Sequence, residues 1–424
     1  MAENFDMNPN TTTGLSAEMK TYYSDYLIDN AVPNLVHDQF AQKHPIPANG
    51  GKTINFRKFV PFSKATKPLS EGVTPSGGSL SVTNVTADVS QYGYYVTLSD
   101  VLMLTAVDNT LVETTKLLGS QAGSTLDTVT REVLNSGTNV MYAGGKEGRS
   151  YLKEDSKITV EDIYKAARFL KSQNAPRIEG GYVAIIHPDV AYDLMRDPEW
   201  VDVNKYAGGE NIFTGEIGKI AGVRFVESTE AKIFHAEDLT STTRTLTIKS
   251  FWNDGTDTTA EYGTPCKFKI TYNETISEED AAALVGKHIH VRNANASEGS
   301  NYVFPLVVGG MSPSTKTLFF LESAFPIPMA FVPEQGDTIY PEGGGAFGTA
   351  VYATLFMGAN AFGVIEPEGE GMEMIIKTKE QIGGPLNQFG TIGYKFCHGA
   401  KILYQERLLR VESGSSYGEI DEAN

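Results

Sequence analysis

The sequence predicts an α+β fold that carries an additional β-rich domain, and three observations lead to this prediction. Apolar residues recur at helical spacing over about residues 110–137, whereas they alternate with polar residues, as in strands, on both sides of that segment. Residues 236–345 differ from their flanks because short alternating stretches are separated there by many Gly and Pro residues. At 424 residues, the chain is long enough for several domains.

The first 50 residues are expected to form an N-terminal arm without a core of its own. Residues 1–14 are polar and aperiodic, and a short helical pattern that includes Met19, Tyr22 and Tyr26 follows and stops near Pro33. The segment shows neither the basic and apolar pattern of a signal peptide nor a long charged helix that could serve as a built-in scaffold.

Residues 51–98 are predicted to form a long β-hairpin with a wide tip. Ile54 and Phe56 alternate with polar residues, and similar alternation runs from Val85 to Leu98, while the tip between them is rich in Pro and Gly. An isolated ribbon is marginally stable in water, so we expect this one to lie on a neighbouring copy of the chain. The residues that we expect at this contact are Phe59, Phe62, Lys64, Lys67 and Glu71.

The helix predicted over about residues 110–137 is unusually long. Thr110 and Glu113 form a potential capping box, and Gly137 is the expected end. Such a helix would be a rod of about 40 Å. Its length indicates a structural spine rather than an ordinary surface helix.

The rest of the chain alternates between helical and strand patterns. A helix over about 159–173, a buried strand over 182–186, a helix that begins at His187-Pro188-Asp189 and a strand–turn–strand over 215–226 are expected before residue 235. Strand patterns return at 351–356 and 362–365, and a last strand is expected at 408–411 before an acidic tail. Residues 236–345 are therefore expected to be an insertion, with strands at 245–251, 267–272, 288–292, 302–308 and 317–320 and a short helix that begins at Ser277.

Composition excludes several classes of function. The formal charge of −17 disfavours nucleic-acid binding as the main role, because phosphate backbones would be repelled. No apolar run approaches the roughly 18–20 residues that a membrane helix requires, so we expect a soluble, cytosolic protein. Cys266 and Cys397 are far apart and lack zinc-site spacing, so both are expected to be buried thiols.

Four strings resemble functional motifs, but their context argues against each. Gly343–Gly348 fits G-x-G-x-x-G without a strand before it and a helix after it, and Gly414–Gly418 fits G-x-S-x-G within a polar tail. His288 and His290 could share a metal ion, but no third ligand lies nearby in the sequence, so an exposed strand face is expected. His187 is expected to be a local structural residue. The sequence therefore predicts no catalytic residues, no cofactor and no metal.

Several strings, in one order along the chain, closely resemble the major capsid proteins of tailed bacteriophages, in the family typified by N-four-like podophages. The resemblance covers about residues 15–235 and 346–413. The strings that carry it include EMKTYY (18–23), PNLVHDQF (33–40), GGKTI (50–54), LSEGVTP (69–75), VTLSD (96–100), LDTVTRE (126–132), HPDV (187–190), PLNQ (385–388) and AKIL (400–403).

This resemblance implies the Hong Kong 97-type capsid fold. It would assign residues 1–50 to the N-terminal arm, 51–98 to the extended loop and 99–157 to a peripheral domain with the spine helix. The axial domain would comprise residues 158–235 and 346–400, interrupted by the inserted β-rich domain 236–345. Residues 401–424 would form a strand that returns to the peripheral domain, followed by the acidic tail.

The implied function is that of a structural major capsid protein. Copies of the chain would assemble as hexamers and pentamers into an icosahedral shell that encloses double-stranded DNA without sequence-specific binding. The implied partners are a portal and scaffolding or cement proteins, and the location is the virion, assembled in the host bacterial cytoplasm without a membrane.

Three alternatives remain open at this point. An encapsulin-like cellular compartment would share the fold. An enzyme would need a nucleophile, a base and an orienting acid, which the sequence does not display. A carbohydrate-binding insertion would use Trp252 and Tyr262, although packing in a core or an interface explains these aromatic residues at least as well.

Overall fold

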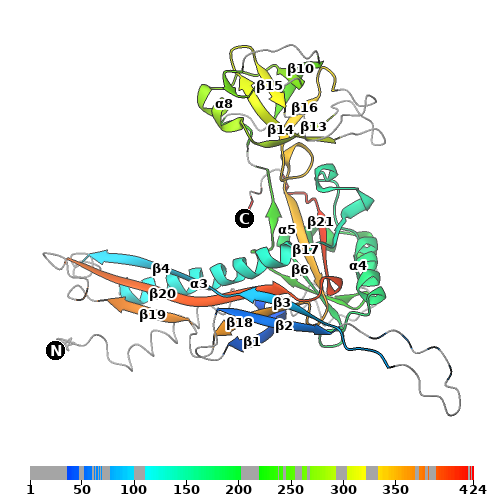
Figure 1. Ribbon diagram of the computed structural model, residues 1–424, viewed down its shortest axis with the longest axis vertical. Coiled ribbons are helices and arrows are strands. Elements are labelled where there is room, and N and C mark those ends of the chain that lie inside the picture. The colour runs from blue at the N-terminus through cyan, green and yellow to red at the C-terminus, as the bar shows by residue number, and fades with distance from the viewer. Residues whose placement is uncertain are drawn as a thin grey trace. The chain divides into compact units, whose positions relative to one another are not determined.

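The computed structural model (Figure 1) describes most of the chain, in two compact units. Unit 1 contains residues 1–138, 175–178 and 358–408, and unit 2 contains residues 139–174, 179–357 and 409–424. The predicted helical stretch before Pro33 and most of the predicted hairpin tip lie outside the described residues. The described residues are 36–46, 52–59, 62, 64, 66, 68, 77–99, 110–201, 219–236, 238–241, 245–253, 260–264, 268–292, 303–320, 333–367, 372–377, 381, 388–418, 421 and 423–424.

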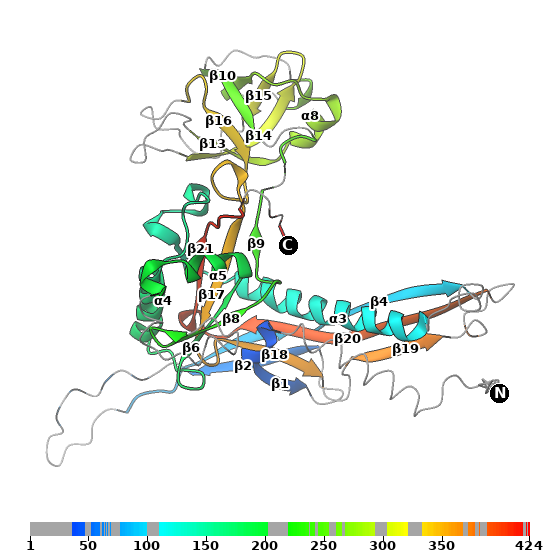
Figure 2. The ribbon, with the colours of Figure 1, turned by 180° about the vertical axis from the view of Figure 1, so that it is seen from behind.

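Unit 1 is built on a sheet with a long helix against it. The strand order is β1-β18-β20-β19, and β4 also pairs with β20. Helix α3 (Thr110–Asn135) runs alongside β4 and β20 in Figure 1 and in the reverse view of Figure 2, and its Leu118 and Ala122 are buried against Leu98 and Phe396. The strands are β1 (Gln42–Ile46), β4 (Ser90–Ser99), β18 (Phe362–Pro367), β19 (Glu373–Lys377) and β20 (Phe389–Ile402), and the short 3₁₀ segments are η2 (His37–Phe40) and η6 (Gln405–Arg407).

Helix α3 confirms the predicted spine. It begins at Thr110, as expected, and ends at Asn135, two residues before Gly137. Leu118 and Ala122 are almost fully buried, and burying a leucine side chain contributes about 1.5–3 kcal/mol. The apolar stripe predicted from the sequence is therefore the face that packs on the sheet.

The predicted hairpin over 51–98 is present in part. Strand β2 (Thr53–Phe59) pairs with β3 (Val82–Asp88), as expected, but the single second strand expected up to Leu98 is divided, and its later part, β4, pairs with β20. The physical reason is that Tyr92, Val96 and Leu98 of β4 pack into the apolar cluster beneath α3.

Unit 2 contains a mixed sheet in the order β5-β21-β17-β6-β8-β7, with β9 also paired to β17. Every residue of the central strand β6 is buried, and β6 runs parallel to β8 and antiparallel to β17. The strands are β5 (Val140–Tyr142), β6 (Tyr182–Ile186), β7 (Lys219–Ile220), β8 (Val223–Glu227), β9 (Ile233–Phe234), β17 (Val351–Met357) and β21 (Leu408–Ser413). The helical segments are α4 (Val160–Ser172), α5 (Pro188–Met195), η3 (Ala143–Gly145), η4 (Arg149–Tyr151) and η5 (Ala346–Gly348).

Residues 246–341 of unit 2 form a β-barrel with its own core. Antiparallel pairings run β14-β13-β16-β10-β12-β15 and return to β14, so the ring closes, and β11 is added beside β14. A closed ring leaves few strand edges unpaired. Its interior is filled by side chains such as Ile248, Tyr272, Val291 and Ile339. The elements are β10 (Leu246–Asn253), β11 (Tyr262–Gly263), β12 (Phe268–Tyr272), α8 (Glu278–Leu284), β13 (His288–Arg292), β14 (Val303–Ser312), β15 (Thr317–Phe320) and β16 (Thr338–Pro341).

The compact units divide the chain at places other than the expected domain boundaries. The expected peripheral domain 99–157 is split near residue 138, since α3 belongs to unit 1 and β5 to unit 2. The expected second axial segment 346–400 is split near residue 357, because β17 joins the sheet of β6 whereas β20 joins that of β4. Strand β21 lies between β5 and β17, so it pairs with parts of both expected domains.

Candidate functional site

The ribbon of β2 and β3 carries an exposed apolar patch toward its tip. Phe62 is 66% exposed and Leu80 is 60% exposed, and Val82 at the start of β3 is also exposed. The Phe62 ring lies near Gly78, since a Cβ on that glycine would be 3.6 Å from the ring. Side chains of this kind are seldom left uncovered together unless another surface binds them.

The structure locates some of the five residues expected at an intersubunit contact. Phe62 and Lys64 are exposed, as such a contact requires. Phe59 ends β2 opposite Val82, and its side chain is not among those described. Lys67 and Glu71 lie outside the described residues. The contact itself stays a prediction.

The base of the ribbon packs on its own unit. Phe56 and Ala87 are buried against Ile365 and Leu403. At the surface, the Lys58 ammonium lies 3.1 Å from the Glu406 carboxylate, a pair that contributes at most about 1 kcal/mol. The ribbon is therefore fixed at its base by apolar packing, while its far end presents apolar side chains to solvent.

A second exposed aromatic group lies on the sheet of β4 and β20. Tyr94, Tyr95 and Phe389 are all more than half exposed. A groove of about 480 Å³ runs beside them, and Tyr94, Tyr95 and Lys377 contribute to its lining. Gly393 faces Tyr94 so closely across the strands that a Cβ would lie 2.7 Å from the Tyr94 carbonyl oxygen. This close approach explains a glycine inside the long strand β20.

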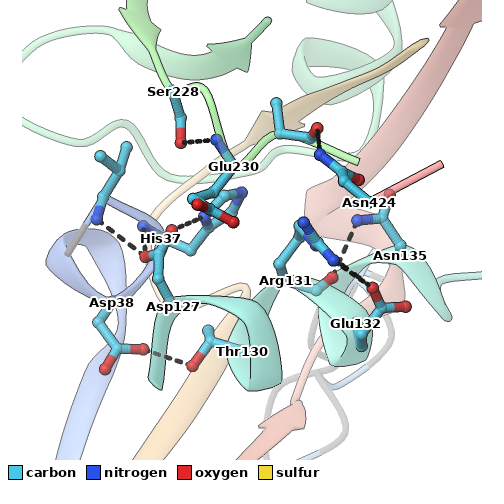
Figure 3. A network of polar contacts seen from close by, with 12 residues as sticks. His37, Asp38, Asp127, Thr130, Arg131, Glu132, Asn135, Ser228, Glu230 and Asn424 are labelled. Atoms are coloured by element: carbon cyan, nitrogen blue, oxygen red, sulfur yellow. Dashed lines mark hydrogen bonds and ion pairs between the residues drawn. The ribbon is translucent and has the colours of Figure 1, made fainter. Parts of the chain in front are cut away.

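A buried polar network anchors the chain just before β1 (Figure 3). The Asp127 carboxylate on α3 accepts hydrogen bonds from the backbone N–H groups of Val36 (2.9 Å) and His37 (2.7 Å), and its second oxygen lies 2.7 Å from His37 Nδ1. The Thr130 hydroxyl donates to Asp38 Oδ1 at 2.6 Å. The side chains of His37 and Asp127 are both fully buried.

This network extends from α3 to β20. Thr130 Oγ1 lies 2.9 Å from His398 Nε2, and burial lowers the pKa of His398 to about 4, so its imidazole is neutral at ordinary pH. No sequence pattern predicted a role for His37, Asp127 or His398. The available signal was that the strings PNLVHDQF and LDTVTRE both resemble capsid sequences, since these strings hold His37 and Asp127.

The G-x-S-x-G string, which was placed in a polar tail from the sequence, is packed against unit 2. Ser415 is fully buried and donates to Asp193 Oδ2 at 2.9 Å, and Ser416 N–H also donates to that oxygen at 2.8 Å. The Lys157 ammonium lies 2.9 Å from Asp193. Burial disfavours ionisation of Asp193, but the bonds from Lys157, Ser416 and Ser415 outweigh it and lower the pKa. Ser415 therefore holds the tail in place by donating to a carboxylate that is also paired with Lys157.

His187, Asp189 and Asp421 lie together where the tail docks. Each offers a ligand atom within 4.8 Å of the others. His187 caps α5, because its Nδ1 accepts from the Asp189 N–H, which supports the structural role expected for it. Burial and the neighbouring Asp421 carboxyl raise the pKa of Asp189 to about 6, while the Tyr352 hydroxyl donates to Asp421. The nearby Asp421 carboxyl therefore disfavours ionisation of Asp189.

We expect the docked tail to weaken as the pH rises through about 6. The folded-state pKa of Asp189 is about 6, above its ordinary 3.8, so its contribution to stability is present below about 4 and lost as pH rises through 6. Burial lowers the pKa of His187, which acts in the opposite direction. The Asp189→Asn substitution removes the pH dependence that comes from Asp189 and leaves that of His187 in place. The melting temperature of this variant relative to the wild type should therefore increase between pH 5 and 8.

Glu199→Gln, an exposed change in the same unit, serves as the control for this titration and should follow the wild-type curve at every pH. Parallel curves for Asp189→Asn and the wild type would contradict a raised pKa of Asp189 in the folded protein.

An exposed strand face was expected for His288 and His290 of strand β13, and this expectation is wrong for His290. His288 is exposed, but His290 is buried and stacks on Tyr340, with ring centroids 5.5 Å apart. The nearby acidic residue missing from the local sequence is supplied across the sheet, because Glu342 follows β16, the partner strand of β13. His288 Nδ1 lies 3.3 Å from Glu342 Oε2.

The Gly343–Gly348 string follows a strand, β16, which was not expected, but no α-helix comes after it. Gly343–Gly348 leads through η5 into strand β17, so no helix N-terminus follows it as a dinucleotide site requires. Tyr262 is partly buried against the barrel core, which favours a packing role over sugar binding. The Trp252 side chain and Cys266 lie outside what the structure describes, and Cys397, expected to be buried, is half-buried.

Comparisons with known proteins relate the central part of the chain to one family. Residues 83–272, which are 190 of the 424 residues, match the model of a family described as phage capsid protein. This part of the chain is therefore similar to phage capsid proteins. A search of curated protein sequences finds no match.

Solved phage capsids share the α+β fold of this chain. The capsid of the cyanophage P-SCSP1u aligns with a TM-score of 0.51 at 12% identity, over 90% of this chain and 89% of that chain. The capsid of Ralstonia phage GP4 gives 0.51 at 12% identity, over 90% and 88%. The cyanophage Pam1 capsid gives 0.51 at 11% identity, over 98% and 100%.

The match to a phage capsid family supports a structural role in a capsid shell and a location in the virion. This match favours a phage capsid over the cellular compartment considered above. Among the described residues, no helix combines the length and apolar character needed to cross a membrane.

Proposed function

We propose that this chain adopts the Hong Kong 97-type fold and closes, as hexamers and pentamers, into an icosahedral shell. The observation that carries the proposal is the combination in unit 1 of a spine helix packed on a long sheet with a ribbon whose apolar end is uncovered. Phe62, Leu80 and Val82 are left exposed by the subunit itself. A neighbouring copy in a lattice would cover them, and every copy would gain the same contact.

The shell is proposed to enclose double-stranded DNA, with a portal and scaffolding or cement proteins as partners, after assembly in the host cytoplasm. The formal charge of −17 supports enclosure without tight binding, because an acidic wall repels phosphate and leaves packaged DNA free to move. Sedimentation velocity of the purified full chain tests the assembly. Large uniform particles are expected, and a protein that stays monomeric at high concentration would contradict the proposal.

Residues 236–345 are proposed to be an inserted domain. The chain enters them after β9 and leaves them before β17, and these strands pair with each other, Phe234 opposite Val351. The two ends also lie close together, since a Cβ on Gly344 would be 2.9 Å from the Ala236 nitrogen. The barrel between them has its own core. These features are typical of a domain added at one point of a complete fold.

Removing the inserted domain should therefore leave assembly intact. A variant in which residues 237–344 are replaced by a short Gly/Ser linker should fold and form particles of normal diameter, measured by electron microscopy. The separate barrel, residues 238–341, should also fold by circular dichroism. A deletion variant that is folded and soluble but forms no particles would show that the barrel belongs to the lattice.

A further inference from the structure

A cavity lies where the barrel connects to the rest of unit 2, and we call it the neck cavity. Its volume is about 570 Å³, and its lining includes Arg149, Ser150, Lys287, Glu342, Gly343 and Gly344. These residues come from η4, from the position before β13 and from the turn after β16. Groups from the barrel and from outside it therefore face one space.

The lining of the neck cavity carries more positive than negative charge, although the whole chain has a formal charge of −17. Arg149 and Lys287 are cationic, and Glu342 is the carboxylate among the lining residues. Glu342 Oε2 lies 3.3 Å from His288 Nδ1, a ring that offsets the charge of the carboxylate when it is protonated. A cavity lined in this way attracts anions.

The Lys287 ammonium is available to a ligand. It makes no hydrogen bond or ion pair within the part of the chain that the structure describes. The Arg149 guanidinium makes two bonds of 2.7 Å to the buried Glu412 carboxylate. Arg410 Nε donates to that same carboxylate at 2.8 Å, so Arg149 shares its counter-ion with a second guanidinium. An anion in the cavity would add to the negative charge that these cations require.

Two backbone N–H groups of the glycine turn lie at the wall of the cavity without an acceptor. Neither Gly343 N–H nor Gly344 N–H has a hydrogen-bond partner among the described residues. Gly343 has a φ of 122°, which side chains disfavour, and a Cβ on Gly344 would lie 2.9 Å from the Ala236 nitrogen. Successive free N–H groups in such a turn are a common element of anion sites in proteins. The turn thus has a use that requires no helix after it.

Two buried side chains of β13 also lack partners. His290 lines the cavity, and Arg292 lies two residues further along on the same face of the strand. Within the described residues, His290 Nδ1 and Arg292 Nη1 have no hydrogen-bond partner, and no carboxylate pairs with Arg292, which is 2% exposed. A buried guanidinium without a counter-ion is strongly destabilising. An anion in the neighbouring cavity would offset part of that cost.

We propose that the neck cavity binds a tetrahedral oxyanion of the phosphate class. The Lys287 ammonium, the N–H groups of Gly343 and Gly344 and the Ser150 hydroxyl would donate to its oxygens, and Arg149 would add positive charge. Lys287 belongs to the barrel, whereas Arg149 and Ser150 belong to η4 outside it. The anion would therefore connect the barrel to the rest of unit 2.

Isothermal titration of the full chain in a phosphate-free buffer tests this proposal. Inorganic phosphate and a nucleoside monophosphate are the two probes, and saturable binding at one site per chain is expected. Equal affinities would identify the free anion as the ligand, whereas tighter binding of the nucleotide would identify a phosphate ester. In either case the bound probe should raise the melting temperature, because it binds the folded state.

Substitutions of opposite sign make the test specific. Lys287→Gln removes a charged donor and should weaken phosphate binding about 10–100-fold. Glu342→Gln removes the opposing carboxylate and should strengthen it. Lys249→Gln, an exposed change on β10 of the same barrel, alters the net charge as Lys287→Gln does and should keep the wild-type affinity. Circular dichroism checks that all three variants are folded.

The proposal is overturned if neither probe shows saturable binding to the wild-type chain. Equal losses of affinity in Lys287→Gln and Lys249→Gln would also overturn it, because they would indicate attraction by net charge alone. Weaker binding by Glu342→Gln would contradict the electrostatic argument for an anion.

Discussion

Shortening the ribbon is expected to give a folded, soluble subunit that no longer closes into shells. The variant replaces residues 60–81 by Asn-Gly, a turn suited to a two-residue hairpin, and so preserves the pairing of Phe59 with Val82. It removes Phe62 and Leu80, which the subunit leaves exposed. Fully burying such side chains at a contact contributes about 1.5–3 kcal/mol each. A shell repeats that loss at every copy, so assembly should fail.

Circular dichroism together with sedimentation velocity measures this outcome. The base of the ribbon retains Phe56 and Ala87 in its core, so the melting temperature should change little. Thr83→Ala, an exposed change at the start of β3, is the control and should assemble normally. Normal particles from the shortened variant would contradict the role of the tip in assembly, and loss of the fold would show that the tip belongs to the subunit core.

Removing the Asp127 carboxylate is expected to cause the largest loss of stability from a single substitution considered for unit 1. Asp127→Ala leaves two backbone N–H groups and His37 Nδ1 without their acceptor inside a buried site. Removing one partner of a buried charged network costs about 3–5 kcal/mol. Asp127→Asn should cost less, because the amide oxygen can still accept one of these bonds.

Chemical denaturation measures the free energy of unfolding of these variants. Lys116→Ala, an exposed change on the same helix, should stay within about 0.5 kcal/mol of the wild type. An Asp127→Ala variant that is equally close to the wild type would show that the network does not anchor the residues before β1.

Elements with strong local signals were predictable from the sequence. Helix α3 begins at the predicted Thr110, and β6, β13 and β15 have the predicted bounds, because turn residues and clear periodicity mark them. Strand β20 was missed because Gly390, Gly393 and Gly399 interrupt its alternation. Those glycines serve close cross-strand approaches, as Gly393 shows, which are tertiary features that local periodicity cannot reveal.

The polar contacts of the candidate site were harder to predict from the sequence, because they join residues that are far apart in the chain. Asp127 and His37 are 90 residues apart, and Glu342 and His288 are 54 apart, so no local pattern indicates that either pair meets. The ring closure of the barrel was invisible for the same reason, although most of its strands were expected. The exposed tip was predictable, because its Pro and Gly content and its flanking alternation are local properties.

Cryo-electron microscopy of the purified full chain tests the central proposal most directly. We expect closed icosahedral particles of uniform size, built from hexamers and pentamers, in which the end of the ribbon that carries Phe62 and Leu80 is covered by an adjacent copy. Folded protein that forms only small oligomers, or closed shells in which this end of the ribbon faces solvent, would contradict it.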